Sequence, residues 1–238
     1  MNEKTKSVSL RPFAAVHVIV KKDKLNGNRI ILGCSFRLWG DCEFITANHC
    51  IENIVADELF VLDLLEEDPF KENIPVTDII RHPTADIAIL KTVERDLSKY
   101  HKFLISKNDL SLGAPLHGFG YVSRLKDNSF RVVPAFSMRD YHFEEPNYHY
   151  QAIELSMPIP KGTSGAPIFS AWKPNPVIGV ATGCAYSEIE LRNITYYQDE
   201  KMIERERISE FTRFGIALSI KHVLPWIIEN IPGNPIYG

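Results

Sequence analysis

Short apolar runs follow one another along most of the chain, and many of them alternate between apolar and polar positions. They are rich in Val, Ile and Phe, and each is bounded by Gly, Pro, Asn or Asp, which is typical of strands. These runs occupy residues 14–20, 29–38, 42–47, 59–65, 86–92, 114–122, 130–138, 150–157, 166–171, 176–183 and 214–220. Alternation indicates half-buried antiparallel strands, and their short spacing predicts a sandwich or barrels rather than strands that alternate with helices.

Helical patterns are few. Residues 47–54 are long enough for one or two turns, and residues 220–228 form the best helical segment, with Ser219 as a candidate N-cap. Pro225 lies inside that segment. We therefore expect the helix either to begin late or to kink at the proline.

Two polar stretches interrupt the strand pattern. Residues 186–210 are dense in charge and predict a long exposed excursion between two strands, with local helix as one option. Residues 137–150 are rich in aromatic and histidine residues, and we expect them either to line a substrate cleft or to form a barrel loop.

The predicted seam between two barrels lies near residues 102–112. It assigns residues 1–105 to an N-terminal β-barrel and residues 106–238 to a C-terminal β-barrel that ends in the helix.

Composition excludes several classes of protein. The chain has 238 residues, a hydrophobic fraction of 45% and a formal net charge of -3, so neither nucleic acid nor an anionic membrane is expected as its main partner. No stretch approaches the roughly 18 uninterrupted apolar residues of a spanning helix. The first residues carry no signal-peptide pattern, and we therefore expect the chain to stay in the cytoplasm.

The chain has four cysteines, Cys34, Cys42, Cys50 and Cys184, and no C-x-x-C pair. Their spacing does not fit a zinc site, and a reducing compartment favours free thiols. We expect neither a metal ion nor a cofactor.

The motif GTSGAP at residues 162–167 follows an apolar strand and a proline-containing turn. Gly162 can adopt backbone angles that other residues avoid, which allows a sharp turn that exposes the Ser164 hydroxyl. The amides of Gly162 and Ser164 can then point the same way and bind an oxyanion. Taken alone, the motif is weak evidence for a nucleophile.

Two further motifs supply a base and a carboxylate. His49 follows a strand in FITANHC, and histidine is the side chain best able to take and return a proton near neutral pH. Asp86 precedes a strand whose apolar residues draw it toward the interior. Since a buried carboxylate needs a partner, an imidazole N–H would suit it.

Together, in the order His, Asp, Ser, these motifs resemble those of trypsin-like peptidases. ITANHC resembles T-A-A-H-C, TADIAILK resembles D-[IV]-[AG]-[IVL]-L-K, and GTSGAP resembles G-[DN]-S-G-G-P. Residues 33–36 and 177–183 are similar to two further strands of the family, and residues 214–227 resemble the closing strand and helix of HtrA-like members. The likeness spans roughly residues 12–229, and the order of the three residues separates this family from subtilisin-like enzymes and α/β-hydrolases.

The resemblance implies an all-β, chymotrypsin-like fold of two six-stranded antiparallel Greek-key barrels with a C-terminal helix. It also implies a serine endopeptidase in which Ser164 attacks the peptide carbonyl and forms an acyl-enzyme. His49 would then transfer the proton, and Asp86 would orient the imidazole. The amides of Gly162 and Ser164 would form the oxyanion hole.

The family likeness also assigns substrate contacts. Thr182, Gly183 and Cys184 match the strand edge that pairs with a protein or peptide substrate. Pro158 stands where trypsin-specific members carry Asp, so we expect a small or apolar residue before the cleaved bond. Lys161 precedes the oxyanion glycine and either touches substrate or is an exposed loop lysine.

The chain also departs from the family. Thr163 replaces the Asp before the nucleophile, and the chain begins with Met1 rather than a processed I-V-G-G end, so the zymogen switch should be absent. HtrA-like members usually append a PDZ domain, and we do not expect one within these 238 residues. Cys34 and Cys50 have the separation of a family disulfide, but alignment by Phe36 moves Cys34 off that position, and free thiols are favoured.

A cytosolic protease without these controls would endanger its host, so we expect a regulatory protein partner. Two alternatives remain open at this point. The first is a catalytically silent or latent protein-binding module that needs a partner for activation. The second is an acyl transferase or hydrolase that acts on small esters.

Overall fold

The computed structural model describes residues 16–23, 28–62, 73–94, 102–106, 109–122, 129–171, 176–198 and 201–237. Within these ranges the chain is mostly β-strand. Its elements are β1 (Val16–Lys22), β2 (Arg29–Phe36), β3 (Glu43–Thr46), η2 (Asn48–Ile51), η3 (Ala56–Glu58), β4 (Leu59–Leu62), β5 (Asn73–Arg81), β6 (Ala88–Thr92), β7 (Leu104–Ile105), β8 (Pro115–Val122), β9 (Ser129–Glu145), β10 (Tyr148–Leu155), β11 (Pro167–Ser170), β12 (Pro176–Gln198), β13 (Lys201–Ser219) and α1 (Ile220–Asn230).

The first six strands form a closed antiparallel barrel in the order β1-β2-β3-β6-β5-β4. Residues 16–20 of β1 are all buried, and all but His17 are apolar. Ile19 belongs to one buried cluster, with other barrel residues, while Val18 and Val20 belong to a second cluster that includes residues of the other sheet. Both faces of the strand are therefore buried, which favours a continuous apolar run.

The remaining strands form a second sheet in the order β11-β8-β9-β10-β13-β12, and a β11–β12 pairing closes it into a ring. β7 adds to β12 as a short parallel strand. The larger core cluster contains residues of both sheets, among them Phe36, Phe103 and Phe169, so the two units pack directly against each other. The all-β prediction with a C-terminal helix is confirmed.

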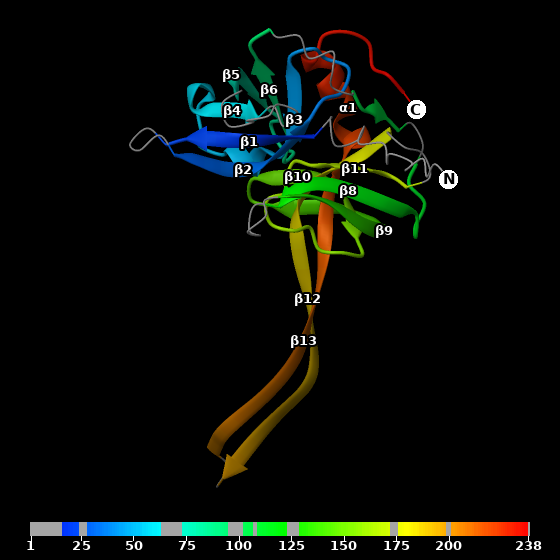
Figure 1. Ribbon diagram of the computed structural model, residues 1–238. Helices are drawn as coiled ribbons and strands as arrows, with labels where there is room; N and C mark the ends of the chain where they lie inside the picture. The colour runs from blue at the N-terminus through cyan, green and yellow to red at the C-terminus, as the bar shows by residue number, and fades with distance from the viewer. Residues whose placement is uncertain are drawn as a thin grey trace, which may run out of the picture.

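β12 and β13 continue far beyond the ring as a two-stranded ribbon that projects from the body (Figure 1). Their pairing runs from Gly179 with Ser219 out to Gln198 with Lys201. The predicted excursion at residues 186–210 is this ribbon: its described residues, 186–198 and 201–210, are the outer parts of β12 and β13 rather than a connection between two strands, and the option of local helix was wrong. The described residues of this segment are strand, because its two halves pair with each other.

The prediction for residues 137–150 was also partly wrong. They form most of a hairpin made by β9 and the start of β10, and the prediction of a barrel loop was therefore wrong. β5 and β7 were not predicted. The expected strand ends at residues 14–15 and 63–65 lie outside the described residues.

The terminal helix α1 begins directly at Ile220, rather than late, and runs through Pro225. Ser219 occupies the N-cap position, although its side chain makes no capping hydrogen bond. Ile220, Val223 and Ile227 are buried, which gives the helix one apolar face. In the described part of the chain, no helix has both the length and the apolar character needed to span a membrane.

Candidate active site

Asp86 follows a tight turn that His82 organises. The Nδ1 atom of His82 accepts hydrogen bonds from the amides of Thr84 (3.1 Å) and Ala85 (2.8 Å). The buried residues on either side of Asp86 anchor it, and Asp86 itself is only 4% exposed. The Thr84 carbonyl also accepts a hydrogen bond from the His149 amide (2.7 Å), which ties this turn to β10 of the second sheet.

His49 lies in the 3-10 turn η2, at the end of β3. Asp86 accepts two hydrogen bonds from it: Oδ1 from the backbone amide (2.8 Å) and Oδ2 from Nδ1 of the ring (2.7 Å). Burial disfavours the imidazolium, but the hydrogen bonds with Asp86 and Cys50 outweigh burial and raise the pKa of His49 to about 10. The carboxylate therefore fixes both the position and the tautomer of the imidazole.

The loop that carries Ser164 is pressed against the strand that leads to His49. Gly165 has φ +84°, and a Cβ atom on it would lie 2.1 Å from the Cys34 carbonyl oxygen and 2.5 Å from Oγ1 of Thr46. The Cys34 amide donates to the Ser164 carbonyl (2.7 Å). Only glycine fits at position 165, because the close approach and the left-handed backbone each exclude a side chain.

Ser164 does not yet engage the imidazole. Within the described residues, its hydroxyl makes no hydrogen bond to His49, and the sulfur of Cys50 lies 3.7 Å from Nε2 instead. Nδ1 donates to Asp86, and the contact with Cys50 helps to raise the pKa of the ring, so it favours the protonated imidazole, in which Nε2–H faces the Cys50 sulfur. A Cβ on Gly33 would lie 2.7 Å from both the Cys50 sulfur and the Ser164 carbonyl oxygen, so the thiol sits beside the Ser164 loop.

Along the backbone around Ser164, every second amide donates to a carbonyl of the protein. The Thr163 amide donates to the Pro160 carbonyl (3.1 Å), and the Gly165 amide donates to the Ala181 carbonyl (2.7 Å). In the part of the chain that the structure describes, the amides of Gly162 and Ser164 have no such acceptor. Gly162 has φ +98°. Two amides on either side of Thr163 are therefore available to an incoming oxyanion.

The residues expected to contact substrate lie at different depths. Thr182 is buried, accepts a hydrogen bond from the Tyr150 hydroxyl (3.2 Å) and donates to the Ile216 carbonyl (3.1 Å). No atom lies within 4 Å of a Cβ built on Gly183, so the space above it is open. Cys184 is exposed, and its sulfur contacts the backbone nitrogen (3.0 Å) and oxygen (3.1 Å) of Ile159.

The other two expected contacts flank the Ser164 loop. Pro158 is half-buried and Lys161 is exposed. The four cysteines are all free thiols, including Cys34 and Cys50. No group of three or more His, Cys, Asp or Glu side chains that could hold a metal ion occurs among the described residues.

A groove of about 390 Å³ runs beside His49 and Asp86. One wall is β12 and the base of the ribbon, and the other comes from the β9–β10 hairpin. The hairpin contributes Phe143, Glu145, Tyr148 and Tyr150. The sequence left two roles open for this segment, a cleft wall or a barrel loop. Its many aromatic and histidine residues were the signal that it could line a cleft. The Asn48 side chain donates to the Tyr148 hydroxyl (3.2 Å) and so ties the hairpin to the His49 turn.

No protein-family model and no curated protein sequence matches the chain. Solved structures do match it. The active form of the Rv3671c protease from M. tuberculosis is similar with a TM-score of 0.65 and 16% identity, over 94% of this chain and 84% of that one. The inactivated protease paralogue S-I1 of the scabies mite is similar with a TM-score of 0.62 and 15% identity, over 92% and 96% of the two chains.

A third similar structure is the HtrA-type protease AlgW with a decapeptide. Its TM-score is 0.60 at 14% identity, and the match covers 87% of this chain and 61% of that one. At these identities the likeness shows the fold. The chain therefore has the chymotrypsin-like fold of trypsin-like and HtrA-type serine proteases, as its motifs predicted.

Proposed function

We propose that this chain is a serine endopeptidase with Ser164 as nucleophile, His49 as general base and Asp86 as the group that orients the base. The observation that carries the proposal is the two-point contact of Asp86 with His49, placed directly beside the Ser164 loop. A buried carboxylate that fixes Nδ1 leaves Nε2 to take a proton from a hydroxyl.

The reaction follows from this arrangement. Ser164 Oγ attacks the peptide carbonyl carbon and its proton passes to Nε2 of His49. The amides of Gly162 and Ser164 stabilise the negative oxygen that forms, and one such donor is typically worth about 3 kcal/mol of barrier. His49 then gives the proton to the leaving amine, and water hydrolyses the acyl-enzyme. Before the first step, Nε2 must lose its own proton and its contact with the Cys50 sulfur.

A peptide substrate is supported by the edge of β12 beside the groove. A small or apolar residue before the cleaved bond is supported by the surroundings of Pro158. The segment from Met157 to Ile159 carries no carboxylate, and the side chain that contacts the Ile159 backbone is the uncharged thiol of Cys184. AlgW, with a similar fold, was solved with a decapeptide and with a tripeptide.

A second candidate function is a latent or silent peptide-binding module that requires a regulatory protein partner. The position of the Cys50 thiol at Nε2 of His49 favours it, because the base is occupied in the resting state. The scabies mite paralogue is an inactivated protease with a similar fold. The two candidates share the groove and differ in whether Ser164 can be deprotonated.

The test is digestion of a library of unmodified peptides, with products read by mass spectrometry. The active enzyme should give cleavages that share a small or apolar residue before the bond, and Ser164→Ala should give none. Identical cleavages by wild type and Ser164→Ala would assign them to a contaminant and overturn the proposal. Cleavage by wild type only after a partner protein is added would select the latent form.

A further inference from the structure

The turn that carries Asp86 is closed by its own backbone and by one side chain. The His82 amide donates to the Ile87 carbonyl (3.1 Å), and the Ile87 amide donates to the Ala85 carbonyl (2.8 Å). Within the turn, Nδ1 of the His82 ring accepts from the amides of Thr84 (3.1 Å) and Ala85 (2.8 Å). Asp86 lies between Ala85 and Ile87, which are both fully buried. The His82 ring thus holds two backbone donors directly beside Asp86.

Only the neutral ring of His82 can make these two contacts. An imidazole nitrogen accepts a hydrogen bond only while it carries no proton, so the proton of this ring must be on Nε2. A second proton on Nδ1 would face two N–H donors, and rotation of the ring would leave both amides without this acceptor. The Ala85 amide would then be a buried donor without a partner, which is costly. Protonation of His82 is therefore incompatible with this form of the turn.

The surroundings of His82 also disfavour its charged form. The ring is half-buried, and it meets the ring of Trp226 edge to face at 5.0 Å, where α1 lies against the first barrel (Figure 1). Burial, and then the charge of His222 on the same helix, lower the pKa of His82 below its ordinary value. Arg81 precedes His82 in the chain, but its guanidinium donates to two backbone carbonyls of the η2 turn and the residues after it (3.2 and 2.8 Å).

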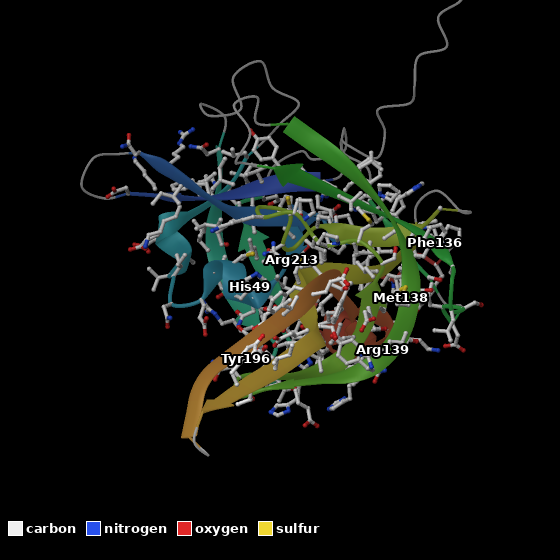
Figure 2. All side chains as sticks on the ribbon, turned by 90° about the horizontal axis from the view of Figure 1, so that it is seen from below. His49, Phe136, Met138, Arg139, Tyr196 and Arg213 are labelled. Carbon is white, nitrogen blue, oxygen red and sulfur yellow. The ribbon has the colours of Figure 1, made fainter. Side chains whose placement is uncertain are left out.

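Asp86 connects this turn to the base. Its two carboxylate oxygens accept from the amide of His49 (2.8 Å) and from Nδ1 of the His49 ring (2.7 Å). His49 lies at the surface beside the base of the ribbon (Figure 2), and its side chain is 35% exposed. A shift of Asp86 would therefore change both the orientation of the imidazole and its pKa.

We propose that His82 is a positioning residue: as a neutral imidazole it shapes the turn that holds Asp86 against His49, and its protonation in acid releases that contact. The contact should be complete above about pH 6.5, the ordinary pKa of histidine, and be lost as the pH falls through the lower pKa of folded His82. The importance of the contact for catalysis rests on the proposed function, whereas the link from His82 to Asp86 does not.

Histidine NMR of the Ser164→Ala protein tests this link without any cleavage. The Nδ1 proton of His49 should give a resonance far downfield, because it lies in a short, charge-assisted hydrogen bond to Asp86, and His49→Ala assigns that resonance. His82→Asn is the matched variant, since its Oδ1 is bonded to Cγ as Nδ1 is in histidine, accepts amides of the next residues and does not titrate. It should keep the resonance and the raised pKa of His49, about 10. His82→Ala should lose the resonance, and the pKa of His49 should fall toward about 6.5.

An acid titration separates the charge of His82 from its bulk. As the pH falls below about 6.5, the parent protein should lose the downfield resonance reversibly, and His82→Asn should retain it, although it keeps all the other titratable groups. His222→Ala removes a charge that lowers the pKa of His82, so the loss should then begin at higher pH. Loss at the same pH in the parent and in His82→Asn would overturn the inference, as would a folded His82→Ala protein that keeps the resonance. If His82→Ala does not fold, the acid titrations of the parent and of His82→Asn decide.

Kinetics distinguish this inference from the proposed function. With Ser164 intact, His82→Ala should lower kcat at least about tenfold with little change in KM, but by less than the loss of about 10⁴ that is typical when the carboxylate itself becomes an amide. If the chain cleaves peptides but His82→Asn loses the resonance in acid as the parent does, the proposed function stands and this inference fails. If the NMR results are as expected but the chain never cleaves, His82 positions Asp86 and the proposed function fails.

Discussion

Asp86 holds His49 at two points, through the backbone amide at 2.8 Å and through Nδ1 of the ring at 2.7 Å. One carboxylate thus fixes the turn that carries the base and the tautomer of the base. Replacement by an amide should disturb both, because an amide presents only one acceptor oxygen.

We therefore expect Asp86→Asn to lower kcat by about 10⁴ with a smaller change in KM, since the wrong tautomer is then favoured. Steady-state kinetics on the best library peptide would measure both constants. The exposed Asp78, whose Oδ1 accepts from the adjacent Ile79 amide, provides the control substitution Asp78→Asn. A similar loss of kcat in Asp86→Asn and Asp78→Asn would contradict the role assigned to Asp86.

The raised pKa of His49 predicts the pH dependence. The base must be neutral to accept a proton, and its pKa is about 10, so kcat/KM should rise with pH well above the ordinary range of histidine. Cys50→Ala removes one of the two hydrogen bonds that raise this pKa, so the rise should move to lower pH. Unchanged profiles in the two proteins would contradict the contact of Cys50 with Nε2.

The raised pKa of His49 also makes the stability of the fold depend on pH. A histidine whose pKa is higher in the folded state stabilises the fold fully below its unfolded pKa, which is about 6.5. Its contribution is lost as pH rises toward about 10. Urea unfolding at a series of pH values should show this loss in wild type, and His49→Ala should lack it. An identical pH dependence in both proteins would argue against the shift.

Gly165→Ala should abolish activity and lower the melting temperature strongly, because the new Cβ would overlap the Cys34 carbonyl oxygen. Gly113 is a matched control: it also has a positive φ, but no atom lies within 4 Å of its Cβ position. Gly113→Ala should cost about 1 to 2 kcal/mol from backbone strain alone, and Gly165→Ala more than about 3 kcal/mol. Equal losses of unfolding free energy in the two variants, measured by urea unfolding, would contradict the close approach of Gly165 to the Cys34 carbonyl oxygen.

The cysteines should differ in reactivity. Cys34 is fully buried, and burial raises the pKa of its thiol to about 12, whereas Cys184 is exposed. Brief treatment of the native protein with iodoacetamide, followed by peptide mapping, should modify Cys184 and leave Cys34 intact until urea is added. Modification of Cys34 in the native protein would contradict its burial.

Sequence patterns predicted most strands of both sheets, because buried strands keep an apolar pattern, and the motifs predicted the contact between His49 and Asp86. The ribbon was not predicted as strand. It projects from the body, so burial against the body imposes no apolar alternation on it, and its charge suggested a solvated loop. β9 continues past the predicted residue 138 to Glu145 for a related reason, since Arg139, Asp140 and His142 are polar and exposed and so give no apolar alternation.

Part of the site also escaped prediction. The contact of the Cys50 sulfur with Nε2 of His49 depends on the close approach of the Ser164 loop to Gly33, which no local pattern records. The hairpin residues that line the groove lie about 100 positions from the His49 turn that they contact. Contacts at such separations arise from the fold rather than from the local sequence.

The most direct measurement of the central claim is labelling with a fluorophosphonate, followed by intact mass and peptide mapping. The account predicts a single adduct on Ser164 of the wild-type chain, and none on Ser164→Ala or on His49→Ala under the same conditions. A folded wild-type chain that takes no adduct from pH 7 to pH 10, with or without Cys50→Ala, would contradict it.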